Sequence, residues 1–159
     1  MKIIKKVLVV LLIVFIAMQF FAPEKNQGSL ETVDAFLAET RPPKKVLAIL
    51  ENTCYDCHSD VTKYPWYNSI TPVNYWLEGH IEEGKEHFNL SAWNEYSIKK
   101  KDHKLDELIE EVEEKEMPLN SYTWTHGDAN LSDEQIQAVI DWAEKVRASY
   151  GISSTLRIE

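Results

Sequence analysis

Residues 52–60 read NTCYDCHSD, and this stretch determines how the rest of the chain is interpreted. Both cysteines of the chain, Cys54 and Cys57, lie here, with His58 directly behind them. The C-x-x-C-H spacing permits a disulfide or thiol redox pair, part of a zinc site, or the covalent attachment site of a c-type haem. These structures imply different proteins, so the surrounding sequence has to decide among them.

A zinc site is poorly supported by the ligands that the chain offers. A structural zinc ion needs four ligands, often two cysteine pairs or one pair with two spaced histidines. The chain has two cysteines and five histidines but no H-x3–5-H element. The adjacency of His58 to Cys57 is also unfavourable for tetrahedral closure around one ion.

A thiol redox pair or a plain disulfide is also disfavoured. Redox pairs of the thioredoxin type lie where a strand meets the start of a helix, whose dipole lowers the pKa of the first thiol. Here the motif lies at the end of a predicted helix, with no βαβ pattern around it. A disulfide between Cys54 and Cys57 would close a very small loop and would stabilise the fold little.

The haem interpretation has a physical reason in the spacing. Two thiols about one helical turn apart can each add to a vinyl group of haem, and the next residue can then bring its imidazole to the iron. We therefore expect Cys54 and Cys57 to attach one haem c per chain. His58 is then expected to be the proximal iron ligand.

Residues 1–22 have the pattern of an export signal or signal anchor. Three lysines precede an apolar run over residues 7–22 that only Gln19 interrupts. A helix of that run spans about 24 Å, slightly short of a ~30 Å hydrocarbon core, although neighbouring apolar residues and lysine stems can extend it. No convincing cleavage site follows, which favours an uncleaved transmembrane anchor over a cleaved signal peptide.

The position of the lysines predicts the compartment of the rest of the chain. Because they precede the apolar run, residues 23–159 are expected outside the cytoplasm, in the periplasm at the inner membrane. This part of the chain has 14 basic and 26 acidic side chains, a net charge of −12. Nucleic acid is thereby excluded as an expected partner, and a partner steered by charge is expected to present a basic surface. Solubility alone would explain the acidity equally well.

The pattern along the chain predicts an all-α fold without a convincing strand pair. Residues 23–42 are expected to form a linker and a short helix, and residues 43–159 a small helical domain. Helices are expected to begin at Pro43, at Thr71-Pro72, at Asp102 and at Ser132, where Ser132 and Gln135 form a capping box. The predicted apolar stripe of the first helix is Val46, Ile49, Leu50 and Thr53, and that of the second is Val73, Trp76, Leu77, His80, Ile81 and Gly84. The third helix has the stripe Leu105, Leu108, Ile109 and Val112, and the last has Ile136, Val139, Ile140, Ala143 and Val146. Gly151 is expected to end the last helix.

Two longer stretches resemble the haem-binding-domain family of small exported c-type-cytochrome-like proteins. They are CYDCHSDVTKYPWYNSITPVNYWLEGHIEEGKEHFNLSAW (residues 54–93) and EMPLNSYTWTHGDANLSDEQIQAVIDWAE (residues 116–144). The YPWY and H-x3-G elements are specific to this resemblance. The second stretch is also similar to the distal half of ordinary c-type cytochromes, where a Met-Pro loop precedes a capped last helix. The resemblance implies haem binding and a location outside the cytoplasm. The expected fold is a small cytochrome c-like helical domain around the covalently attached haem.

The sixth position of the iron has several candidate ligands. Met117, stiffened by Pro118, corresponds to the usual cytochrome c arrangement, although a methionine that ends a helix is also a common core residue. His80 is the main rival, because it lies on the predicted apolar stripe of its helix. His126, His87 and an open or water-bound position are further alternatives, and His103 is expected to be solvated.

These observations predict a monohaem electron carrier that works with redox partner proteins and is not an enzyme. The alternative is a haem-based sensor or peroxidase-like accessory protein whose sixth position is open. A third possibility is an interaction module without haem that is held by a disulfide.

Overall fold

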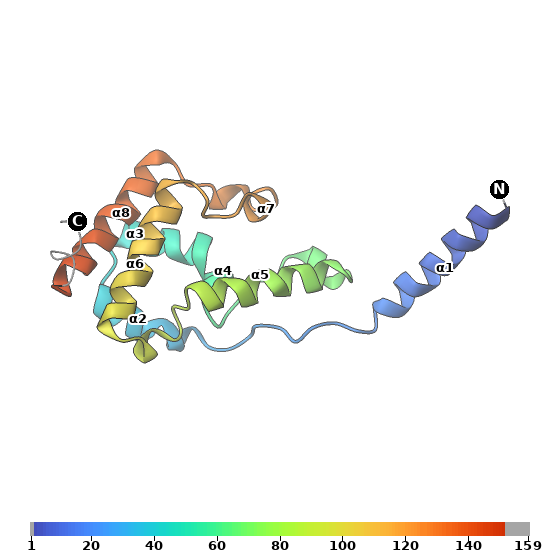
Figure 1. Cartoon of the computed structure of the whole chain (residues 1–159), viewed down its shortest axis with the longest axis horizontal. Helices are drawn as coiled ribbons and strands as arrows, with labels where there is room; N and C mark the ends of the chain where they lie inside the picture. Colours follow the sequence, from blue (N-terminus) through green and yellow to red (C-terminus); the bar gives the residue numbers. More distant parts are fainter. Residues whose placement is uncertain (1, 152–159) are drawn as a thin grey trace.

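The computed structural model describes residues 2–151, and every regular element in that range is a helix (Figure 1). The longer helices are α1 (Lys2–Met18), α2 (Asp34–Thr40), α3 (Lys44–Ile49), α5 (Val73–His87), α6 (Ile98–Glu113) and α8 (Asp133–Ser149). The short turns are η1 (Leu30–Val33), η2 (Leu50–Cys54), α4 (Tyr55–His58), η3 (Trp66–Ser69), η4 (Trp93–Glu95), α7 (Asn120–Thr123) and η5 (Gly127–Ala129). The all-α prediction is confirmed.

The core lies where α2 and α3 pack against the pair formed by α6 and α8 (Figure 1). Phe36 of α2 is fully buried, and the rings of Trp93 and Trp142 meet it edge-on at centroid distances of 5.0 and 5.9 Å. The indole Nε1–H of Trp142 donates to the carbonyl oxygen of Thr40 at 3.0 Å. Edge-to-face contacts of this kind add to the free energy gained by burying the rings. The domain therefore has a well-filled aromatic centre without any sheet in the described range.

Helix α8 forms as its local sequence predicts. The Ser132 hydroxyl accepts from the Gln135 backbone N–H at 3.3 Å, and the Gln135 side chain accepts from the Ser132 N–H at 2.9 Å. All five residues of the predicted stripe are buried. In α3 and η2, the predicted stripe residues Val46, Ile49 and Leu50 are buried as well.

The predicted start of α6 is wrong. The helix begins at Ile98, because the Ser97 hydroxyl caps it five residues earlier by accepting from the Lys100 backbone N–H. Asp102 lies inside the helix, is only 5% exposed and accepts from Arg147 Nε of α8 at 3.0 Å. The predicted apolar stripe is nevertheless correct, with Leu105 and Val112 buried.

The predicted stripe of α5 is only partly correct. Leu77 and Ile81 are buried, but Trp76 is 48% exposed and Asn74 takes a buried place instead. The reason is that α5 extends away from the main body, so neighbouring elements, chiefly α4 and η3, cover only one side of it (Figure 1).

Helix α1 lies apart from the helical body, and its side chains are exposed (Figure 1). Across residues 2–151 the structure contains no helix that is both long enough and apolar enough to span a membrane. The transmembrane part of the prediction is therefore not supported, since α1 ends at Met18 after 17 residues.

The segment between α1 and η1 is held against the domain by hydrogen bonds. The Gln19 amide makes two bonds with the backbone of Thr71, at 2.9 and 3.0 Å. The Asn26 side chain donates to the carbonyl oxygen of Ser59, and the Gly28 N–H donates to that of Asp60 at 2.7 Å. This segment thus follows the turn that comes directly after the C-x-x-C-H motif.

Candidate functional site

The two cysteines lie on consecutive helical turns. Cys54 ends the π-helical turn η2, and Cys57 lies in α4, which continues from it. A single π-turn inside a helix is uncommon and is frequent at functional sites. Both side chains are partly buried, and both thiols are free. The structure therefore contains no disulfide between Cys54 and Cys57.

The acidity of the thiols is unfavourable for disulfide exchange. Burial, together with the neighbouring Cys57, raises the pKa of Cys54 to about 12. Burial and the carboxylate of Asp56 raise the pKa of Cys57 to about 11. The attacking species in disulfide exchange is the thiolate, and redox-active cysteines have lowered pKa values. At neutral pH these thiols stay protonated, which sets them apart from a thioredoxin-type pair.

His58 is oriented by two backbone carbonyl groups. Its Nδ1 lies 2.9 Å from the oxygen of Gly84 and 2.8 Å from that of Phe88. Because carbonyl oxygens only accept, Nδ1 carries the proton and Nε2 keeps its lone pair. Burial holds the pKa of His58 below its ordinary value, although the two carbonyl groups favour the protonated form. The residue is therefore a neutral imidazole with its tautomer fixed, which is the form that ligates metals.

A close helix contact places the carbonyl of Gly84 beside the motif. A Cβ added to Gly84 would lie 2.9 Å from the carbonyl oxygen of Cys57 and 3.1 Å from the Cys57 Cβ. Contacts below about 3 Å require movement of backbone, so only glycine permits α5 to approach α4 this closely. The glycine of the H-x3-G element therefore has a structural reason that the sequence did not reveal.

Asp56, between the two cysteines, connects the motif to two other segments. Its Oδ1 accepts from the Lys63 backbone N–H and its Oδ2 from the Tyr122 hydroxyl, both at 2.8 Å. The carbonyl oxygen of Asp56 also accepts from the Thr62 hydroxyl at 2.5 Å. Tyr122 belongs to α7, in the loop that follows Met117 and Pro118. Sequence reasoning missed both Asp56 and Tyr122, since no local pattern marks a contact between residues this far apart.

Met117 does not contact the cysteine motif through any interaction that the structure records. Its half-buried side chain packs against a small cluster of Val112, Ile136 and Ile140 from α6 and α8. Its backbone N–H donates to the carbonyl oxygen of Glu111 at 3.0 Å. The assignment of Met117 as distal iron ligand stays a prediction.

The histidines predicted as rivals lie in different surroundings. His80 is partly exposed beside Trp76, and its Nδ1 donates to the Trp76 carbonyl oxygen at 2.9 Å. His126 stacks on Tyr122, with a centroid distance of 4.2 Å and an interplanar angle of 16°. His87 is exposed. Of these three, His126 is connected to the motif, through Tyr122 and Asp56.

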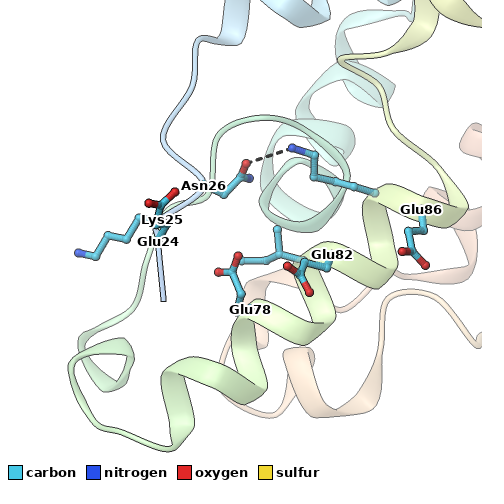
Figure 2. Close-up of a pocket in the computed structure, with 8 residues that line it drawn as sticks. Glu24, Lys25, Asn26, Glu78, Glu82 and Glu86 are labelled. Carbon is cyan, nitrogen blue, oxygen red and sulfur yellow. Dashed lines mark hydrogen bonds between the residues drawn. The ribbon is translucent and has the colours of Figure 1, made fainter. Parts of the chain in front are cut away.

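A cavity of about 600 Å³ lies along α5, and neither Cys54 nor Cys57 is among the residues that line it (Figure 2). Half of its eight lining residues are acidic, namely Glu24, Glu78, Glu82 and Glu86. Lys85 Nζ donates to Asn26 Oδ1 at 3.2 Å and to Asp60 Oδ1 at 2.6 Å, so its charge is already paired. Within residues 2–151 there is no group of three or more acidic, cysteine or histidine side chains that could hold a metal ion alone.

The sequence model of a family described as haem-binding domain matches residues 13–145. The chain belongs to this family. The haem-binding-domain protein is also 32% identical over 114 residues to the cytochrome c peroxidase Ccp of Escherichia coli (strain K12). That match covers 69% of this chain and 24% of the peroxidase, so the chain spans about a quarter of its relative's length. No solved structure matches the chain.

Family membership confirms the resemblance that the motifs indicated, and it makes this chain a haem-binding protein. The residues of the motif fit the group. Two free thiols lie on adjacent helical turns, and a neutral imidazole beside them has its tautomer fixed and its Nε2 free. These are the donor groups that attach and ligate a c-type haem.

Proposed function

We propose that this protein is a monohaem c-type cytochrome that transfers electrons outside the cytoplasm. The observation that carries the proposal is the fixed tautomer of His58 directly after two free thiols. A proximal histidine normally donates its other ring N–H to a carbonyl oxygen, which fixes the ring and raises its basicity toward the metal. Here two carbonyl oxygens, of Gly84 and Phe88, share that role.

Cys54 and Cys57 would hold the haem covalently. Each thiol adds across one vinyl double bond, so that sulfur bonds to one carbon, the thiol hydrogen goes to the other, and no group leaves. The bound iron would supply one-electron chemistry between its ferric and ferrous states. The chain would then position the haem, ligate its iron and set the electrostatic environment of the iron. No residue is proposed to act as a general acid or base.

We propose Met117 as the sixth ligand. Its side chain is only half-buried, and the loop behind it reaches the motif through Tyr122. A thioether ligand raises the reduction potential of the iron relative to a second imidazole. His126 is the alternative whose ring is connected to the motif.

The proposed location and partners follow from the N-terminal pattern and from the charge. Covalent attachment of haem c takes place outside the cytoplasm, and the basic and apolar start of residues 1–22 is typical of an exported chain. The strong excess of acidic side chains, including the carboxylates of the cavity in Figure 2, supports a redox partner that presents a basic surface.

The test of covalent attachment compares the wild type with Cys54→Ala/Cys57→Ala after maturation with the c-haem apparatus. The wild type is expected to keep its haem through denaturing electrophoresis, and the double variant is expected to lose it. Equal haem retention in the two proteins would overturn the proposal. A structural control is Cys54→Ser/Cys57→Ser, which keeps polar groups of similar size and should also lose the haem.

A second candidate function is a peroxidase-like or sensory protein with an open sixth position. Two observations favour it: a relative is named a cytochrome c peroxidase, and Met117 packs on an apolar cluster. Rapid binding of carbon monoxide to the reduced wild type would support this candidate. Slow binding, limited by displacement of an internal ligand, would support the electron carrier.

A further inference from the structure

A partly buried hydrogen bond joins the loop after Met117 and Pro118 to the cysteine motif, and η5 of the same loop also packs against η2. The Tyr122 hydroxyl donates to Asp56 Oδ2 at 2.8 Å. The ring of Tyr122 stacks on His126, whose Nδ1 lies 3.1 Å from the Tyr122 carbonyl oxygen. The two contacts between Tyr122 and His126 therefore hold the loop around the Tyr122 ring, whose hydroxyl binds the motif.

The acceptor of this bond is itself held in place. Asp56 Oδ1 is occupied by the Lys63 backbone N–H, and the carbonyl oxygen of Asp56 is occupied by the Thr62 hydroxyl. Rotation of the carboxylate away from Tyr122 would therefore also break its hydrogen bond with the Lys63 backbone N–H. A hydrogen bond to an ionised carboxylate is stronger than a neutral one.

A second contact of the loop is more exposed. The Tyr67 hydroxyl of η3 lies 3.0 Å from Thr125 Oγ1, and the Tyr67 ring meets that of His126 edge-on at a centroid distance of 6.4 Å. Water competes for the Tyr67–Thr125 contact far more than for the Tyr122–Asp56 bond, because its polar atoms are exposed. The Asp56–Tyr122 bond is therefore the stronger of the two connections.

We propose that the Asp56–Tyr122 hydrogen bond positions the Met117 loop against the motif and thereby limits access of outside ligands to the iron. This inference rests on the proposed function, with haem attached at Cys54 and Cys57. Tyr122 acts through the loop that carries Met117 and is a positioning residue. The bond joins the element of the proximal ligand directly to the loop of the proposed distal one, 66 residues apart between Asp56 and Tyr122.

The test uses the haem-loaded full chain and the variant Tyr122→Phe. Tyr150→Phe is a matched control, because the Tyr150 hydroxyl donates to the carboxylate of Glu39 at 2.6 Å and joins the end of α8 to α2 instead. Two quantities are measured: the rate of carbon monoxide binding to the ferrous protein, and amide hydrogen exchange of residues 119–130. Carbon monoxide has to displace the internal ligand, so its binding rate reports how often the loop releases that ligand.

In Tyr122→Phe the rate of carbon monoxide binding and the exchange rate of the loop amides are both expected to rise about ten-fold or more. This factor corresponds to losing the free energy of one hydrogen bond to a charged group. Tyr150→Phe is expected to leave both unchanged. Equal behaviour of the two variants would overturn the inference, as would faster exchange without faster carbon monoxide binding. If the wild type carries no covalent haem, the proposed function fails and the ligand-limiting role fails with it. If haem is attached and Tyr122→Phe behaves as the wild type, only the positioning role fails.

Discussion

Gly84 of α5 lies so close to Cys57 of α4 that an added Cβ would be 2.9 Å from the Cys57 carbonyl oxygen. The same glycine offers its own carbonyl oxygen to His58 Nδ1. One helix contact therefore fixes both the backbone of the second cysteine and the ring of the predicted proximal ligand.

Gly84→Ala is expected to destabilise the domain by about 1–3 kcal/mol, because the extra methyl group has to displace backbone atoms of the motif. Gly79→Ala, five residues earlier in α5, is the control. Nothing lies within 4 Å of a Cβ added there, and alanine is the better helix former by about 1 kcal/mol. Chemical denaturation measures both effects. A Gly84→Ala protein as stable as Gly79→Ala would show that the close contact is absent.

Asp102→Ala is expected to cost about 3 kcal/mol of unfolding free energy, because it leaves the guanidinium of Arg147 without its buried partner. The side chains of Asp102 and Arg147 are 7% and 12% exposed, and Nε of Arg147 lies 3.0 Å from Asp102 Oδ1. Asp106 also pairs with Arg147, but its side chain is 56% exposed. Asp106→Ala should therefore cost less than about 1 kcal/mol. Similar losses in the two variants, measured by urea denaturation, would contradict this ranking.

Glu39 should make stability depend on acid pH. Burial alone would raise its pKa, but hydrogen bonds from Lys101 and Tyr150 outweigh burial and hold the pKa below the ordinary 4.5. A carboxyl with a lowered pKa in the folded state contributes stability above its unfolded pKa and loses it as the pH falls through the folded value. The stability difference between the wild type and Glu39→Gln should therefore be constant at neutral pH and shrink below pH 4.5. A difference that stays constant down to about pH 3 in thermal unfolding would exclude this contribution.

Met117→Ala is expected to remove the near-infrared charge-transfer band of methionine-ligated ferric haem and to lower the reduction potential. Loss of the thioether leaves a position that water or another side chain occupies. Met18→Ala in the exposed helix α1 is the control and should leave both properties unchanged. Survival of the band in Met117→Ala would rule out Met117 as the ligand. The appearance of an unchanged bis-histidine spectrum in both proteins would point to His126.

The sequence predicted those features that depend on local chemistry. The cap of α8 follows from Ser132 and Gln135, and its buried stripe follows from the helical spacing of its apolar residues, so both could be predicted from the sequence. The start of α6 could not be predicted in this way. Aspartate is a residue type that often caps helices, but Asp102 instead pairs with Arg147, which lies far along the chain. The helical spacing of Trp76 predicts a core position, whereas the extension of α5 from the body leaves this side chain 48% exposed.

For the site, the sequence predicted the residues of the motif but not their supports. Cys54, Cys57 and His58 lie within five residues, so their spacing, taken together with the rest of the sequence, could indicate haem attachment. The carbonyl groups that fix His58, the close approach of Gly84 and the Asp56–Tyr122 bond all join segments that only the tertiary structure brings together. A distal ligand from a separate loop is likewise beyond what spacing can establish.

The most direct test of the central claim is the pyridine haemochrome spectrum of the unfolded wild-type protein after maturation with the c-haem apparatus. Attachment through both Cys54 and Cys57 predicts the spectrum of a haem whose two vinyl groups have become thioethers, with one haem per chain. The spectrum of haem with intact vinyl groups, or no haem absorbance in the unfolded protein, would contradict it.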